Sequence, residues 1–306
     1  MKYFLIYNPT ARQGRSMKEF RRIISILRNR GVSFECAQTT RKNEAIDLAK
    51  LATKDKFDVV VPIGGDGTIC EVITGLLSQQ KETMPIMGVI HIGTSPDFNR
   101  YHQIPIKVDE AIEVLLNGKT RKIDIGKVMH TTLDRKEGTV SYFGGSVNIG
   151  LGPSIASRSN RRYRKYLGDF LGTLSSTLVS LANFNPINLK LKVDGRSLDF
   201  ENIINLTVGK DPYLASGMRV PMEMAQDNGN LYLLSIRGRY KLPVIANLWR
   251  LYLGNILDYS GAKLLQCREV EVMGKENEKL EFDGDVRGYL PAKIEVVPRS
   301  LEVLVK

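Results

Sequence analysis

The first 118 residues alternate between short apolar runs and longer amphipathic stretches. The apolar runs predict strands, and the stretches between them have the spacing of helices, one ended by Gly31 and another opened by Asn43 as its N-cap. Alternating strands and helices are typical of a parallel α/β unit. The predicted strands are residues 2–7, 32–38, 59–63 and 85–92, and the predicted helices are residues 16–30, 43–54, 69–77 and 109–117.

From about residue 121 the pattern changes to strands separated by turns, which indicates an antiparallel sheet or sandwich carrying two helices. The sequence therefore predicts an α/β fold with two domains. Residues 1–120 form a parallel α/β nucleotide-binding domain and residues 121–300 an antiparallel, β-sandwich-like domain, with a ligand cleft between them. The predicted strands are 122–129, 141–149, 188–193, 203–208, 231–236, 269–273, 280–282 and 292–297, and the helices are 161–182 and 243–257.

A glycine-rich segment, Gly64-Gly65-Asp66-Gly67-Thr68, joins the strand at 59–63 to the following helix. We expect these glycines to turn the backbone with positive φ and to aim N–H groups at one point, where the helix N-terminus favours an anion. Thr68 is expected to cap the helix and to donate its hydroxyl to a phosphate. A carboxylate at Asp66 would repel a phosphate unless a metal ion lies between them. The segment thus predicts a site for a Mg-nucleotide.

Other interpretations of this loop remain open at the sequence level. Glycine-rich turns are common in α/β folds, and Asp66 could merely cap the helix. The loop lacks the Lys of a P-loop, and Cys70 stands where a dinucleotide fingerprint has its third glycine.

The composition indicates the class of partner and the cellular compartment. The formal net charge of +11 favours nucleic acid, anionic lipid or phosphorylated ligands as partners, and three widely spaced cysteines favour a reducing compartment, by default the cytoplasm. The N-terminus has no signal-peptide pattern, and the apolar stretch 167–184 is too polar for a membrane span. We therefore expect a cytoplasmic protein that touches a bilayer without crossing it.

A basic cluster precedes that apolar stretch, and its residues are Arg158, Arg161, Arg162, Arg164 and Lys165. Near an anionic leaflet each cation adds about 1 kcal/mol of attraction, so the cluster predicts peripheral membrane docking. A solvated face is the plainer alternative. Nucleic acid is not an expected partner, because no recognisable nucleic-acid-binding module accompanies the cluster.

Several short motifs occur in a fixed order along the chain: Asn8-Pro9, Thr40, the Gly64–Thr68 loop with Glu71 and Gly75, Gly93–Phe98, Asn148-Ile149-Gly150, Asp227-Asn228-Gly229 and Asp283-Gly284-Asp285. In this order they resemble the soluble lipid kinases of the diacylglycerol kinase and sphingosine kinase type, in particular the small bacterial branch. The glycine-rich loop alone also occurs in NAD kinases, and the later motifs make the resemblance specific to lipid kinases.

The resemblance implies an ATP- and Mg²⁺-dependent kinase that phosphorylates the hydroxyl of a membrane lipid, most simply diacylglycerol. ATP would lie in the cleft, and a C-terminal strand at 301–306 would return to the first domain. Asp285 would be the general base and Asp66 a second catalytic carboxylate. A metal site would use Asn228 and the carbonyls of Ala225 and Asn230. The residues implied to line the nucleotide are Asn8, Pro9, Thr10, Ala11, Arg12, Thr40, Gly64, Gly65, Asp66, Gly67, Thr68, Ile69, Cys70 and Thr94.

Three positions depart from the family pattern: Pro96 stands in place of Asn, Asn228 in place of Asp, and Asp285 in place of Glu. The Asp283–Asp285 and Asp227–Gly229 segments could also be simple turns, since Asp-Gly favours hairpins. The alternatives are therefore an NAD kinase-like enzyme, or a lipid or nucleotide binder with weakened catalysis. The three histidines show no metal-ligand spacing, and a homodimer remains open.

Overall fold

The central strand of the N-terminal sheet is β1 (Tyr3–Tyr7), which runs parallel to β2 (Phe34–Gln38) on one side and to β3 (Val59–Gly64) on the other. β3 also pairs in parallel with β4 (Ile86–Met87) and β5 (Ile90–His91). The predicted strand 85–92 is thus interrupted. At the interruption the backbone passes close to a helix, since a Cβ on Gly88 would lie 2.4 Å from Leu115 Cδ1.

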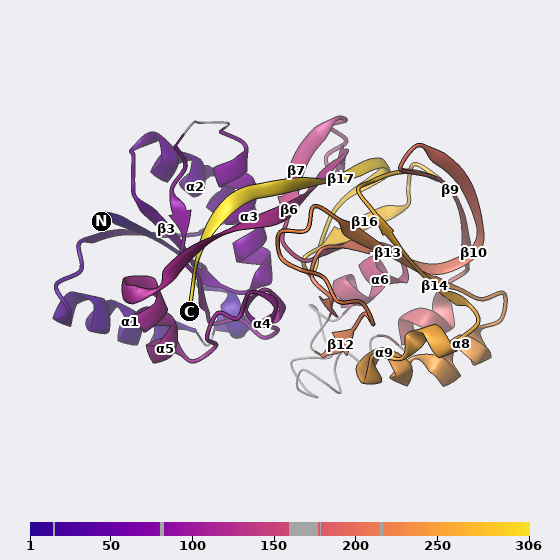
Figure 1. Ribbon diagram of the computed structural model, residues 1–306, viewed down its shortest axis with the longest axis horizontal. Helices are drawn as coiled ribbons and strands as arrows, with labels where there is room; N and C mark the ends of the chain where they lie inside the picture. The colour runs from indigo at the N-terminus through magenta and orange to yellow at the C-terminus, as the bar shows by residue number, and fades with distance from the viewer. Residues whose placement is uncertain (15, 80–82, 159–176, 178, 215–216) are drawn as a thin grey trace. The chain divides into compact units, whose positions relative to one another are not determined.

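The computed structural model shown in Figure 1 describes all of the 306 residues except 15, 80–82, 159–176, 178 and 215–216. The chain divides into two units, Met1–Ile125 with Pro298–Lys306, and Gly126–Val297. The long strands β6 (Lys119–Thr132) and β17 (Asp285–Val305) carry the chain from one unit to the other. The last part of β17 joins the first unit's sheet, where Val303 pairs in parallel with Met87.

The helices of the first unit pack in two pairs. α1 (Met17–Asn29) contacts α5 (Val108–Asn117), and α2 (Glu44–Lys54) contacts α3 (Asp66–Leu77). Two short helices, η1 (Ala11–Gly14) and α4 (Asp97–His102), follow β1 and β5. The core of this unit contains apolar side chains from the sheet and from α1 and α5, including Leu5, Tyr7, Ile23, Val61, Ile63 and Ile112.

The beginning of α2 differs from the sequence prediction. Asn43 occupies the N-cap position with φ of 64°, but its side chain makes no capping hydrogen bond. Instead, the carboxylate of Glu44 accepts hydrogen bonds from the backbone N–H groups of Thr40 and Arg41 and from the Thr40 hydroxyl. The left-handed backbone of Asn43 thus makes the turn before α2, while the carboxylate of Glu44 holds Thr40 and Arg41 in place.

The second unit is built on an antiparallel sheet, in which the strand order is β14-β13-β10-β8-β16-β17. β9 pairs antiparallel with β10 and with β15, β15 with β17, and β7 with β6. The strands are β7 (Thr139–Phe143), β8 (Ser146–Gly150), β9 (Ile187–Val193), β10 (Arg196–Gly209), β11 (Tyr213–Leu214), β12 (Met218–Arg219), β13 (Leu231–Arg237), β14 (Ala262–Cys267), β15 (Glu269–Met273) and β16 (Lys279–Phe282). The helices of the unit include α6 (Leu151–Arg158), α8 (Lys241–Asn247), α9 (Trp249–Leu253) and η3 (Ile256–Asp258).

Several predicted elements of this unit have different limits. The strand 141–149 is two strands, β7 and β8, and the strands 292–297 and 301–306 are parts of the single strand β17. The helix 243–257 is three short helices, of which α9 ends at Gly254 because this residue adopts φ of 71°. β14 was not predicted, since polar residues interrupt its apolar pattern. Most of the predicted helix 161–182 lies outside the described residues.

The packing of α3 against α2 generates a testable prediction. A Cβ on Gly75 would lie 2.5 Å from the Ile46 carbonyl oxygen and 2.6 Å from Ala49 Cβ, so Gly75→Ala should push the two helices apart. We expect the free energy of unfolding to fall by about 1–3 kcal/mol in chemical denaturation. Leu51→Ala, on the exposed face of α2, is the control and should change it by less than about 0.5 kcal/mol. Equal effects of the two substitutions would contradict the packing argument.

Candidate active site

The carboxyl ends of β1 and β3 form a topological switch point. After β1 the chain passes to β2 on one side, whereas after β3 it passes to β4 on the other side. The loops that follow β1 and β3 therefore diverge. In open α/β sheets, ligands bind where loops diverge in this way. The loop after β1 holds residues 8–12, and the loop after β3 leads directly into α3. The structure thus brings together two of the sequence motifs that lie far apart along the chain.

Asn8 joins these two loops through its side chain. Its Nδ2 donates a hydrogen bond to Thr68 Oγ1 at 2.9 Å, and its Oδ1 accepts from the backbone N–H and the hydroxyl of Thr10 at 3.0 and 2.8 Å. Thr68 is buried in the first turn of α3, whose N-cap residue is Gly65. The prediction that Thr68 caps the helix is therefore wrong. Its hydroxyl instead fixes the position of Asn8.

The glycines of the loop are needed for close approach. Gly65 has an extended backbone with φ of −103°, and Gly64, Gly65 and Gly67 are not among the glycines with positive φ, so that expectation was wrong. A Cβ on Gly64 would lie 2.4 Å from Thr68 Oγ1, and a Cβ on Gly93 would lie 2.5 Å from the Cα of Gly65. Side chains at these positions would separate the loop from its neighbours.

Asp66 stands at the beginning of α3 and faces His91 at the end of β5 and Asp97 at the beginning of α4. Its Oδ2 accepts a hydrogen bond from the backbone N–H of Asp97 at 3.3 Å, and its Oδ1 lies 3.5 Å from Nε2 of the buried His91. Sequence reasoning placed His91 in a strand, where it lies, but gave it no role. Nothing in the local sequence signals the contact, because β5 reaches Asp66 only through pairing with β3.

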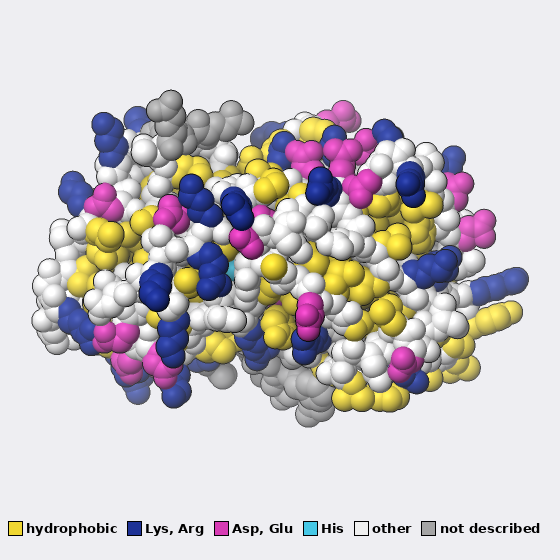
Figure 2. All heavy atoms as spheres, viewed as in Figure 1, with side chains coloured by type: hydrophobic (Ala, Val, Ile, Leu, Met, Phe, Trp, Pro, Cys, Tyr) yellow, Lys and Arg dark blue, Asp and Glu magenta, His cyan; other side chains and the backbone are white. Residues whose placement is uncertain are grey.

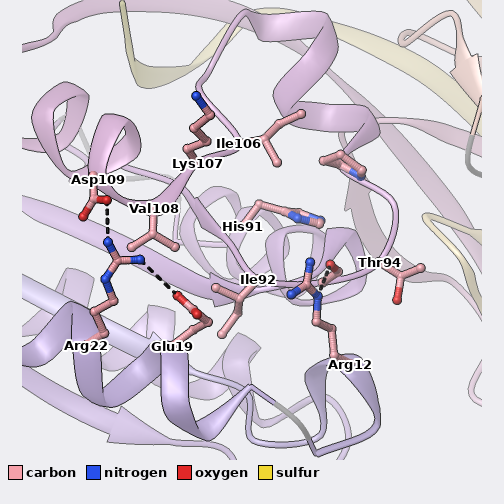
Figure 3. A pocket seen from close by; sticks show the side chains of 12 residues that line it. Arg12, Glu19, Arg22, His91, Ile92, Thr94, Ile106, Lys107, Val108 and Asp109 are labelled. Carbon is pink, nitrogen blue, oxygen red and sulfur yellow. Dashed lines mark hydrogen bonds and ion pairs between the residues drawn. The ribbon is translucent and has the colours of Figure 1, made fainter.

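A cavity of about 320 Å³ lies within the first unit (Figure 3), and its wall includes His91 and Gly93, which approach Asp66 and Gly65 of the loop. Two residues predicted to line the nucleotide, Arg12 and Thr94, form part of its wall, together with Pro96. Arg12 Nε donates to the Gly93 carbonyl oxygen at 3.2 Å. Arg22 is paired with Asp109 at 2.5 Å and lies 3.7 Å from Glu19. The cavity therefore combines fixed cations with backbone groups next to the glycine loop.

The other predicted nucleotide residues have different surroundings. Ile69 and Cys70 lie in the hydrophobic core, each 1% exposed, so their side chains are placed for packing. Thr40 is exposed after β2 and bonds to Glu44. Pro9 and Ala11 are partly exposed in the loop that follows β1.

In the second unit, the Asp283-Gly284-Asp285 segment is the turn between β16 and β17. Asp283 and Gly284 adopt φ of 50° and 89°, as a tight turn requires. The carboxylate of Asp283 accepts three backbone N–H bonds, from Gly144 at 3.0 Å, Gly145 at 3.0 Å and Ser146 at 3.1 Å. Asp285 Oδ2 lies 3.4 Å from Arg287 Nη2. Asp283 thus anchors the turn that presents the predicted base.

Glu281 is an acidic residue of this region that the sequence analysis missed. It is buried, and its two carboxylate oxygens accept hydrogen bonds from Asn148 Nδ2 at 2.7 Å and from the backbone N–H of Gly284 at 2.6 Å. Burial raises the pKa of Glu281 to about 7. The local sequence gives no signal of this burial, because a glutamate that alternates with apolar neighbours is the ordinary pattern of a half-exposed strand.

The turn at 225–230, predicted to hold a metal ion, contains an ammonium group. Nζ of the fully buried Lys210 donates to Asn228 Oδ1 at 2.6 Å and to the Asn230 carbonyl oxygen at 3.2 Å. These are two of the three oxygens that were predicted as metal ligands. The side chains at this turn do not fit a divalent metal ion, because a fixed positive charge already bonds those oxygens. Among the described residues, no cluster of three His, Cys, Asp or Glu side chains is arranged for a metal.

Comparison with known protein families identifies two regions. Residues 2–128 match the model of the diacylglycerol kinase catalytic domain, and residues 145–305 match that of the YegS C-terminal NAD kinase beta sandwich-like domain. The chain is 23% identical over 303 residues to a diacylglycerol kinase of Staphylococcus haemolyticus, covering 98% of this chain and 86% of the relative. It is also 23% identical to a diacylglycerol kinase of Staphylococcus carnosus, covering 98% and 93%.

Solved structures confirm the fold class at a coarse level. A diacylglycerol kinase from Bacillus anthracis superposes with a TM-score of 0.74 at 21% identity, covering 100% of this chain and 97% of that chain. A yeast NADH kinase in complex with NADH superposes with a TM-score of 0.56 at 13% identity, covering 100% and 83%. At these identities the likeness shows a shared fold alone. The predicted mixed α/β fold with a C-terminal β-sandwich domain is confirmed.

The buried carboxyl of Glu281 predicts a pH dependence of stability. An acid whose pKa is higher in the folded state, here about 7 against an ordinary 4.5, holds its proton more tightly when folded. The free energy of unfolding should therefore fall as the pH rises from 4.5 to 7, by on the order of 3 kcal/mol from this group. Glu281→Gln, which carries no titratable proton, should reduce this fall in denaturation curves measured across the range. The control is Glu137→Gln at an exposed position, and an unchanged slope for Glu281→Gln would refute the assignment.

Proposed function

Because the chain belongs to the diacylglycerol kinase family and is thus a lipid kinase, we propose that it transfers the γ-phosphate of ATP to the hydroxyl of diacylglycerol or a related membrane lipid. The observation that carries the proposal is the glycine loop at the switch point of the first unit. There the N-terminus of α3, the Asn8–Thr68 hydrogen bond and the adjacent cavity lie together.

The triphosphate of ATP binds at the beginning of α3 in this proposal. The first N–H groups of a helix have no partner within the helix, and its dipole favours negative charge at that end. Close packing of Gly64 and Gly65 keeps side chains away from the loop, so a phosphate can approach the backbone. Arg12 and Thr94, on the wall of the cavity, supply a cation and a hydroxyl for the same ligand.

Asp66 acts on the magnesium that accompanies ATP as part of the substrate. A carboxylate at a helix N-terminus beside phosphate is repulsive unless a cation lies between them. The N–H of Asp97 and the ring of His91 hold the Asp66 side chain in one orientation. With its carboxylate fixed in this way, Asp66 neutralises phosphate charge through the cation, which is the main requirement of phosphoryl transfer.

Asp285 accepts the proton of the lipid hydroxyl as that oxygen attacks the γ-phosphorus. Its neighbour Asp283 holds the turn through three N–H bonds, and Glu281 holds the N–H of Gly284 between them. A turn fixed at both ends limits the freedom of the short Asp285 side chain, and such positioning is needed for general-base catalysis.

The acceptor is a membrane lipid in this proposal, and the protein reaches it from the membrane surface. Within the described segments, no helix has both the length and the apolar character needed to cross a bilayer. The basic cluster Arg158–Lys165, predicted to bind the anionic surface, lies almost entirely outside the described residues, so its docking role remains a proposal.

Labelled ATP, Mg²⁺ and diacylglycerol in mixed lipid vesicles should give labelled phosphatidic acid with the purified protein. Asp66→Asn removes the charge that faces the cation and should lower the rate by at least about 100-fold. Asp285→Asn removes the base and should lower it by about 100- to 10,000-fold. Asp55→Asn, at an exposed position after α2, is the matched control and should retain the wild-type rate.

Two outcomes would reject the proposal. Turnover of soluble NAD without any effect of vesicles would favour the NAD kinase-like alternative. ATP binding in calorimetry without turnover of either acceptor would favour a binding protein, and a gain of activity in Pro96→Asn with Asp285→Glu would then trace the loss to these departures from the family pattern.

A further inference from the structure

Lys210 is a charged residue buried in the second unit. It follows β10 directly and is 0% exposed, which is rare for lysine because removing an ammonium from water is costly. The cost is offset only when the group is hydrogen-bonded. Nζ donates to Asn228 Oδ1 at 2.6 Å and to the Asn230 carbonyl oxygen at 3.2 Å, so the turn at 225–230 contributes two hydrogen bonds to this compensation.

Hydrogen bonds within the same turn hold the oxygens that contact the ammonium. Asn228 Oδ1 also accepts the backbone N–H of Asn230 at 3.1 Å, and Asn230 Nδ2 donates to the Asn228 carbonyl oxygen at 3.0 Å. The amide oxygen of Asn228 thus accepts from Lys210 and from the backbone at once. Its oxygen is therefore directed at the cation, as a ligand oxygen would be.

Lys210 also links this turn to the region of the predicted base. Its backbone N–H donates to the Gly145 carbonyl oxygen at 2.9 Å, and the N–H of Gly145 donates to Asp283 Oδ1 at 3.0 Å. The contacts run from the 225–230 turn through Lys210 and Gly145 to the turn that carries Asp285.

We propose that the ammonium of Lys210 replaces the divalent metal ion that the family resemblance implies at the 225–230 turn. A carboxylate with a divalent cation carries a local charge of about +1, and so does a neutral amide with an ammonium. The neutral Asn228, which stands where the family pattern has Asp, therefore matches the single positive charge of Lys210. The turn is held without a metal, and the departure at Asn228 is compensated within the same unit.

Thermal unfolding without nucleotide tests this replacement. The melting temperature of the wild-type protein should be the same in EDTA and in Mg²⁺, because Lys210 already fills the turn. Lys210→Met should lower it by roughly 5 °C or more in both solutions, since Asn228 Oδ1 and the Asn230 carbonyl oxygen each lose the hydrogen bond from the ammonium. Lys192→Met, which removes a half-exposed lysine paired with Glu271, is the control and should change it little.

A double variant makes the test specific. Lys210→Ala with Asn228→Asp restores a carboxylate and removes the ammonium, so its melting temperature should fall in EDTA and recover in Mg²⁺. The proposal is overturned if the melting temperature of the wild-type protein is higher in Mg²⁺ than in EDTA. It is also overturned if the melting temperature of the double variant is the same in Mg²⁺ and in EDTA. The wild-type measurement stands even where a variant fails to fold, and none of these measurements depends on kinase activity.

A second, independent observation concerns apolar side chains on α8, α9 and η3. Leu242 is 78% exposed, Leu253 66% and Trp249 52%. Figure 2 shows yellow side chains gathered along the lower right edge, where Figure 1 places α8 and α9. We call the five exposed side chains of this region the apolar face, and they are Tyr240, Leu242, Trp249, Leu253 and Leu257.

Cationic side chains border the apolar face. Arg239 and Lys241 flank Tyr240, and the guanidinium of Arg250 lies 5.0 Å from the centre of the Trp249 ring while pairing with Asp258 at 2.7 Å. Aromatic rings beside cations are typical of segments at the level of lipid headgroups, where the ring is half in hydrocarbon and the cation meets anionic lipid. Each cation near such a surface adds about 1 kcal/mol of attraction.

We infer that the apolar face docks on a bilayer that contains anionic lipid, an inference that rests on the proposed lipid kinase function. Sedimentation without ATP should show binding to vesicles of phosphatidylcholine with phosphatidylglycerol and weaker binding to phosphatidylcholine alone. Leu242→Ser with Leu253→Ser should lower vesicle binding by 10-fold or more, at unchanged melting temperature. Leu198→Ser with Met273→Ser, at exposed positions on β10 and β15, is the matched control.

The kinase and docking hypotheses separate in a soluble assay. The Leu242 and Leu253 double variant should phosphorylate a short-chain, water-soluble diacylglycerol at the wild-type rate. Wild-type vesicle binding by this variant would overturn the docking inference. So would light scattering that shows a dimer dissociated by the same substitutions, because the face would then bind a second copy of the chain.

Discussion

The candidate nucleotide site depends on one close approach, that of the Gly65 backbone to Gly93. A Cβ at Gly93 would lie 2.5 Å from the Cα of Gly65, so the two segments can touch only as bare backbone. This contact draws the turn between β3 and α3 against the segment that follows β5. As a result Asp66 reaches both His91 and the N–H of Asp97, and Gly93 offers its carbonyl oxygen to Arg12. The chemistry of the site follows from a steric constraint.

In the second unit, a network of hydrogen bonds between polar side chains orders the strands around the predicted base. Asn148 donates to Glu281 and accepts from Asn205 at 3.1 Å and from Thr207 at 2.7 Å. These buried or partly buried groups satisfy one another, so they order β8, β10 and β16 around the turn of Asp283 and Asp285 at little cost. The motif at Asn148 therefore acts through hydrogen bonds to neighbouring strands.

The sequence predicted features that depend on nearby residues and missed those that depend on distant ones. The apolar run 59–63 and the spacing of 69–77 identified β3 and α3 because each pattern is complete within a few turns or residues. The partnership of Asn8 with Thr68 spans 60 residues and arises only when β1 and β3 pair. The role of the glycines was misjudged for the same reason, since close approach is a property of two segments. Lys210 was overlooked because lysine is normally a surface residue, and only its contact with Asn228 shows otherwise.

The path of the chain through β6 and β17 has a consequence for synthesis. Residues 126–297 are an insertion in the first unit, whose sheet is completed by residues 298–306; in Figure 1 the yellow end of β17 lies beside the indigo and violet strands. On the ribosome, the inserted unit is available for folding before the unit that surrounds it has its last strand. The side chains of Leu301, Val303 and Leu304 are buried there, so a nascent chain lacking them leaves apolar surface uncovered. Synthesis of the first unit thus begins first and is completed last.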